Sequence, residues 1–120
     1  MIVRYFKERG YRGQGKDPSI TLGNSYLVLG ITFQLDGYPN QISIQRESDG
    51  TPCLFDLDFF EVLDAALPSG WCFFELGGGR YALEPKEFGG EFWDLFHDGD
   101  EKAEQVFAEV VSKLRAFHGG

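Results

Sequence analysis

The 120-residue sequence lacks several features that mark particular classes of protein. Its only cysteines, Cys53 and Cys72, form no Cys-x-x-Cys pair and have no histidines at ligand spacing, so we expect no zinc site. Whether they pair is left open by the sequence, although reduced thiols are usual in a cytoplasmic protein. No run of ~18 apolar residues is present, so no transmembrane helix is expected. The N-terminal residues lack the apolar segment and cleavage site of a signal peptide, which predicts a cytoplasmic location.

Positive charge is scarce in the second part of the chain. Lysine and arginine total 11 against 19 aspartate and glutamate residues, for a net charge of −8. Residues 1–52 hold six basic and five acidic residues (+1), whereas residues 53–120 hold five and fourteen (−9). Nucleic-acid binding ordinarily needs a basic surface, so direct binding of DNA or RNA is disfavoured. An acidic half suits either solubility or a basic partner.

Motifs for nucleotide binding and nucleophilic catalysis are missing as well. Gly10, Gly15 and Lys16 have the spacing of a phosphate-binding loop, but Asp17 stands where a serine or threonine would hold Mg²⁺. Pro18 follows where a helix would have to begin, so no helix N-terminus is available for a phosphate. No serine lies in a Gly-x-Ser-x-Gly context, and neither cysteine has a histidine nearby. We therefore expect an ordinary loop at 10–18, no cofactor and no catalytic site.

The clearest feature that is present is a long amphipathic helix over 100–117. Its apolar residues follow the three-four spacing of one helical face and fall within a sector of roughly 100°. They are Ala103, Val106, Phe107, Val110, Leu114 and Phe117. Asp98 and Glu101 have the spacing of an N-terminal capping box, and Gly119 suits the C-terminal end. A helix with such an apolar face needs a partner layer, which predicts a sheet upstream.

A hairpin is the strongest prediction for that sheet. In 25–35 the odd-numbered side chains from Leu27 to Leu35 are apolar, and we expect all of them to be nearly buried on one face. A turn leads to a second strand over 41–47, with Ile42 and Ile44 facing inward.

The remaining strands are shorter, and one segment is ambiguous. Strands are expected at 1–7 and 53–55, and a second hairpin at 71–83 turns on three successive glycines. Residues 56–67 fit either a strand or a helix with Asp58 as its cap. The expected fold class is α+β, an antiparallel sheet packed against the C-terminal helix in a single domain over 1–120.

Three side chains are candidates for site chemistry. On a strand, Asp56 and Asp58 would share a face and could hold a metal or act as an acid–base pair, but no third ligand has a suitable spacing. His97 precedes Asp98-Gly99-Asp100, which has ligand types for a cation, although a helix cap and a turn explain those residues equally well. We therefore expect solvated carboxylates and no metal.

An acidic cluster is the candidate binding surface. Five carboxylates fall within eleven residues around the predicted start of the long helix, namely Asp94, Asp98, Asp100, Glu101 and Glu104. The first of them, Asp94, lies within the aromatic block of Phe92, Trp93, Leu95 and Phe96, and the others follow it; the block predicts a short helix packed on the sheet. Whichever of Trp93 or Phe92 remains exposed would be an interface anchor, and we favour Trp93.

Three stretches resemble small acidic bacterial immunity proteins, which bind and neutralise secreted toxins, often nucleases. They are Leu-Gly-Asn-Ser-Tyr-Leu-Val at 22–28, Leu-Phe-Asp through Leu-Pro-Ser-Gly-Trp at 54–71, and Gly-Glu-Phe-Trp through Asp-Gly-Asp at 90–100. The resemblance implies an interaction protein, not an enzyme, whose acidic surface blocks a basic toxin domain. The alternative is a small-ligand-binding or enzymatic α+β domain with a carboxylate-lined pocket that uses Asp56, Asp58 or His97.

Overall fold

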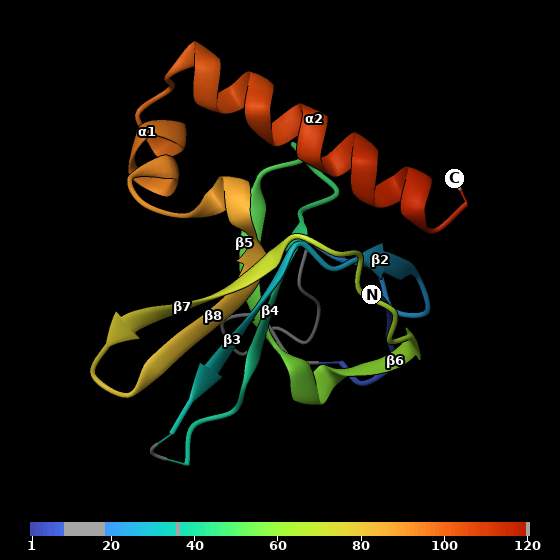
Figure 1. The fold of residues 1–120 in the computed structure, drawn as a ribbon. Coiled ribbons are helices and arrows are strands. Elements are labelled where there is room, and N and C mark those ends of the chain that lie inside the picture. The colour runs from blue at the N-terminus through green and yellow to red at the C-terminus, as the bar shows by residue number, and fades with distance from the viewer. Residues whose placement is uncertain (9–18, 36, 120) are drawn as a thin grey trace.

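A computed structural model describes residues 1–8, 19–35 and 37–119 (Figure 1). The ordinary loop predicted at 10–18 lies outside these residues. The elements are strands β1 (Ile2–Tyr5), β2 (Ser25–Leu27), β3 (Gly30–Gln34), β4 (Gln41–Gln45), β5 (Pro52–Asp56), β6 (Phe60–Asp64), β7 (Trp71–Gly77) and β8 (Arg80–Pro85), 3₁₀ turns η1 (Leu57–Phe59) and η2 (Lys86–Phe88), and helices α1 (Phe92–His97) and α2 (Glu101–Phe117).

The strands form two antiparallel sheets, and the fold class is α+β as predicted. A five-stranded sheet has the order β5-β4-β3-β8-β7, and a three-stranded sheet has the order β2-β1-β6. Figure 1 shows α2 lying across one end of the strands, with α1 beside its N-terminal end. Among the described residues, no helix is long and apolar enough to cross a membrane.

The predicted continuous strand over 25–35 is wrong, because the chain passes from one sheet to the other in its middle. β2 pairs with β1, whereas β3 pairs with β4 and β8. Between them, Val28 lies in one core and Leu29 in another, and each is at most 1% exposed. Strict alternation assumes a single buried face, so it fails here: Thr32 on the other face is buried, and Leu35 at the strand end is 67% exposed.

Most of the other strand predictions are confirmed. Ile42 and Ile44 are fully buried on β4, and the hairpin of β3 with β4 is confirmed. β1, β5 and the β7–β8 hairpin are also confirmed. The three glycines at 77–79 all have positive φ, between 62° and 85°, a backbone that side chains rarely adopt. The ambiguous segment combines one 3₁₀ turn, η1, with a strand, β6, and Asp58 caps no helix.

The start of α2 corrects the predicted cap. The side chain of Asp100, not Asp98, accepts a hydrogen bond from the Ala103 N–H at 2.9 Å. The Asp98 N–H instead closes α1 by donating to the Asp94 carbonyl at 3.0 Å. Gly99, at φ 82°, separates the two helices, so the cap falls two residues later than the spacing with Glu101 suggests.

The buried face of α2 is rotated from the predicted one. Val111 is buried, while Val106 is only partly buried and Phe117 is 46% exposed. At 100° per residue, the buried residues still span a sector of about 100°, shifted by about 40° toward Val111. The shift moves Val106 and Phe117 to the edge of the contact.

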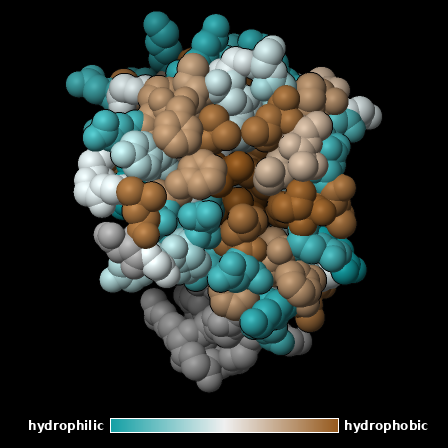
Figure 2. All heavy atoms as spheres, turned by 60° about the horizontal axis from the view of Figure 1, so that its bottom comes forward, coloured by the Kyte–Doolittle hydropathy of each residue, from teal (hydrophilic) through white to brown (hydrophobic). Residues whose placement is uncertain are grey.

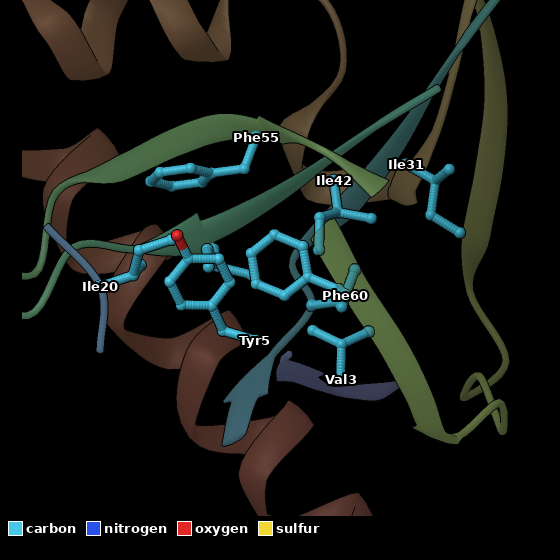
Figure 3. Packing of buried hydrophobic residues seen from close by; sticks show 9 residues of the cluster. Val3, Tyr5, Ile20, Ile31, Ile42, Phe55 and Phe60 are labelled. Atoms are coloured by element: carbon cyan, nitrogen blue, oxygen red, sulfur yellow. The ribbon is translucent and has the colours of Figure 1, made fainter. Parts of the chain in front are cut away.

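Two apolar cores hold these layers together. The first lies between the two sheets, where Figure 3 shows the rings of Tyr5, Phe55 and Phe60 beside Ile42. The second joins Leu29, Phe88 and Phe92 to the buried face of α2. Trp71 packs against both cores.

Candidate functional site

The five predicted carboxylates lie around the turn from α1 to α2, and we refer to Asp94, Asp98, Asp100, Glu101 and Glu104 as the acidic corner. All five are exposed. Asp94 is on α1, Asp98 and Asp100 flank the turn, and Glu101 and Glu104 are in the first turn of α2. None forms an ion pair with any residue that the structure describes. The positive end of the α2 dipole favours carboxylates at this position without neutralising their charge.

Trp93 is the accessible member of the predicted anchor pair. Phe92 is 8% exposed and belongs to the second core, whereas Trp93 is partly buried. The Trp93 ring packs against Phe88 at a centroid distance of 4.8 Å, and its Nε1–H donates to Glu84 Oε1 at 3.3 Å. The exposed apolar side chain on α1 is Leu95, at 44%, which the sequence placed in the packed aromatic block.

Beside α1 the structure contains a pocket of about 220 Å³, here called the Glu84 pocket. It lies on the face of the five-stranded sheet that carries Gly30, Ser43 and Ala82, whose small side chains leave the space. Trp93 and His97 reach it from α1. The described residues of the lining are Gly30, Thr32, Ser43, Pro52, Cys53, Leu54, Leu76, Arg80, Ala82, Glu84, Trp93 and His97.

Glu84 is the carboxylate of this pocket. Burial disfavours the charged form and raises the pKa of Glu84 to about 7, and the hydrogen bond from Trp93 offsets part of that rise. Gly30 provides the room for the side chain, because a Cβ on Gly30 would lie 3.1 Å from Glu84 Cβ and 3.2 Å from Glu84 Oε2. Sequence reasoning missed Glu84. The available signal was a glutamate continuing the alternation of β8 on the face of the buried Ala82.

The candidate pair of Asp56 and Asp58, for which we expected solvated carboxylates, is not arranged as a site. Asp56 ends β5 and accepts a hydrogen bond from Gln41 Nε2 at 3.3 Å, whereas Asp58 is exposed on η1. The 3₁₀ turn breaks the strand geometry that would have put both carboxylates on one face. His97 is exposed and stacks on Trp93 at 6.0 Å. In the described part of the chain, no group of three or more His, Cys, Asp or Glu residues is placed to hold a metal ion.

The two cysteines are free and partly buried, and Cys53 also lines the Glu84 pocket.

Figure 2 shows apolar side chains gathered on the side of the molecule turned away from α2. On the sheet face opposite the Glu84 pocket, Phe73 is 61% exposed. Its ring packs between those of Phe33 and Tyr81, at centroid distances of 5.9 Å and 5.4 Å. The protein therefore presents three distinct surfaces: the acidic corner, the Glu84 pocket beside it, and this aromatic face.

Comparisons of the chain with protein-family models, with curated proteins and with solved structures find no match.

Proposed function

We propose that this protein is an interaction protein of the immunity type, which binds and neutralises a basic toxin domain through the acidic corner. The observation that carries the proposal is the set of five exposed carboxylates that have no ionic partner among the described residues. The resemblance of the sequence to acidic immunity proteins supports the same conclusion. Nuclease toxins are the first candidates, because a surface that binds nucleic acid is basic and would be attracted to this corner.

Such a function requires no catalysis. Charges on the acidic corner act over a Debye length of ~8 Å at physiological salt and would steer a cationic partner into contact. Residues 53–120 carry a net charge of −9 (five basic, fourteen acidic), so the field around the corner has the same sign. Trp93 and Leu95 on α1 then offer apolar contacts next to the charges. Together these groups supply fast association and a local anchor.

Charge reversal tests the proposal. The variant Asp94→Lys, Glu101→Lys, Glu104→Lys should associate at least ~10-fold more slowly with the partner at low salt, and the deficit should shrink as salt is raised. Stopped-flow or surface-plasmon kinetics against toxin domains encoded beside the gene provide the measurement. The fold should be retained, because exposed charges contribute little to stability.

A second triple variant gives a matched control. Asp58→Lys, Glu75→Lys, Glu109→Lys changes the net charge by the same amount at exposed positions outside the acidic corner. We expect a smaller loss of association rate in this control. Equal slowing in both variants would mean that only total charge matters, and a wild-type rate for the first variant would place the interface elsewhere.

The second candidate function, a small-ligand-binding or enzymatic domain, is favoured by the raised pKa of Glu84 in a pocket. However, Asp56 and Asp58 do not line this pocket, and among the described residues of its lining Glu84 is the single carboxylate, beside the imidazole of His97. Its volume of about 220 Å³ is also below the ~300–1,000 Å³ of ordinary small-molecule sites. Geometry therefore supports the interaction protein better.

A further inference from the structure

We propose that the Glu84 pocket receives one organic cation, the guanidinium or ammonium group of an arginine or lysine side chain of the partner. This inference rests on the proposed function, since the partner supplies the side chain. It adds a specific binding site to what would otherwise be long-range attraction by the acidic corner.

The first argument is the incomplete hydrogen bonding of the Glu84 carboxyl group. Oε1 accepts the indole N–H of Trp93 at 3.3 Å, while Oε2 accepts no hydrogen bond from any residue that the structure describes. A cationic donor in the pocket would give this oxygen a charge-assisted hydrogen bond. Arg80, the basic residue in the lining, forms no ion pair with Glu84. Four residues apart on β8, the two are separated by about 13 Å of strand.

The second argument is the shape of the cavity around this oxygen. A Cβ on Gly30 would lie 3.1 Å from Glu84 Cβ and 3.2 Å from Glu84 Oε2, so the carboxyl group lies against the Gly30 backbone and a larger residue at position 30 would displace it. Ser43 and Ala82 keep the neighbouring positions small. At about 220 Å³, the pocket suits a single side chain better than a larger metabolite.

The third argument concerns the walls. Trp93 and His97 stack on one another and form the side nearest α1, so their rings make one wall of the pocket. Leu54 and Leu76 provide apolar surface for the methylene stem of the side chain. Because α1 also carries Asp94 and leads into the acidic corner, the same helix connects the attracting charges to the pocket.

Cation binding should depend on pH in a recognisable way. A cation needs the ionised form of Glu84, so affinity should rise roughly 10-fold between pH 6 and pH 8 as a group with a pKa of about 7 loses its proton. The other titratable groups in the lining are His97, Cys53 and Arg80. His97→Asn removes the imidazole that stacks on Trp93, so it separates any effect of His97 from that of Glu84. We expect the asparagine variant to keep the pH dependence and Glu84→Gln to lose it.

The test uses single amino-acid probes and requires no partner. N-acetylarginine methylamide or N-acetyllysine methylamide is titrated into the protein while the Trp93 indole N–H resonance is followed by NMR. We expect saturation with a Kd in the millimolar range for at least one probe at pH 8, and no saturation with N-acetylnorleucine methylamide. Gly30→Ala and Glu84→Gln, checked for folding by circular dichroism, should each weaken binding at least ~10-fold. Equal shifts in Glu84→Gln, equal shifts with norleucine, or no shift at 50 mM probe would overturn the proposal.

Partner kinetics keep the two proposals distinguishable. Glu84→Gln should speed dissociation from the toxin domain at least ~10-fold and leave association nearly unchanged, because it removes a short-range contact. If charge reversal at the acidic corner slows association but Glu84→Gln dissociates at the wild-type rate, the pocket proposal fails and the proposed function stands. If the probes bind but charge reversal has no effect, the acidic corner is not the interface.

Discussion

Among single residues, Glu84 shows how a local environment changes the behaviour of an ordinary carboxyl group. Its pKa in the folded protein is about 7 against 4.5 for an exposed glutamate, so the native state binds more protons than the unfolded chain between these values. Stability is therefore lost as pH rises through this window. Ionisation of Glu84 at neutral pH lowers the free energy of unfolding. A residue with only a structural role would not need an ionisable group here, so this loss of stability agrees with a binding role.

Replacing Glu84 with glutamine should consequently stabilise the protein at high pH. At pH 8 we expect a gain of about 1–2 kcal/mol in the free energy of unfolding, after allowing for the partial exposure of the side chain. The gain should be nearly gone near pH 4.5, where the wild-type carboxyl group is protonated in the folded state and half protonated in the unfolded chain. Urea unfolding of both proteins at the two pH values measures this, with the exposed Glu75→Gln on β7 as the control. A Glu84→Gln variant less stable than wild type at pH 8 would contradict the assignment.

The sequence did not reveal Glu84 for a physical reason. Its pKa depends on Gly30 and Trp93, which lie 54 positions before it and 9 after it in the chain, and only the pairing of β3 with β8 brings Gly30 close. The acidic corner, in contrast, is continuous in sequence and was found by composition. A cluster of residues that are close in sequence can thus be identified from the sequence alone. A site assembled across strands can be identified only when the register of the strands is known.

Among the elements, α2 offers a direct comparison of the predicted and observed caps. Asp100→Ala should lower stability by about 1 kcal/mol, because it leaves the Ala103 N–H without its side-chain acceptor. Asp98→Ala should change it by less than about 0.5 kcal/mol, since that side chain makes no hydrogen bond with a described residue. Thermal melting of the two variants decides the matter. A larger loss for Asp98→Ala would restore the cap that the sequence spacing suggested.

The rotated face of α2 leads to a second comparison along the same helix. Phe107 is 7% exposed and contacts Phe96 at 4.8 Å, so Phe107→Ala should cost ~3–5 kcal/mol. Phe117 was predicted on the same stripe but is 46% exposed, and Phe117→Ala should cost less than about 1 kcal/mol. Denaturant midpoints measure both. If Phe107→Ala melts within a degree or two of wild type, the assignment of α2 to the core is contradicted.

The rotation also shows which part of helix prediction is robust. The width of the apolar sector followed from spacing alone, but its centre depends on which side chains meet Leu29 and Phe88. Both valines at 110 and 111 are apolar, and only packing decides that each is buried. For the strands, Ile42 and Ile44 could be placed because β4 buries one face, whereas 25–35 could not, because two sheets share it.

At the scale of the whole molecule, the fold class followed from the sequence, but the division of the strands into two sheets did not. Periodicity identifies strands and their buried sides, yet it carries no information about which strands become neighbours. The three surfaces are arranged with the acidic corner and the Glu84 pocket near α1 and the aromatic face on the opposite side of the five-stranded sheet. A partner held at α1 would leave that aromatic face uncovered.

The passage of the chain from β2 to β3 has a consequence for the cooperativity of unfolding. Val28 and Leu29 are neighbours joined by one peptide bond, and each is buried in a different core. Loosening either core pulls on a backbone that the other core holds, so we expect the two cores to melt together. We expect one heat-absorption peak in calorimetry, with equal calorimetric and van't Hoff enthalpies, and two resolved peaks would show independent melting. Amide hydrogens in β4 and in the middle of α2 should then exchange with the same opening free energy, although they belong to different layers.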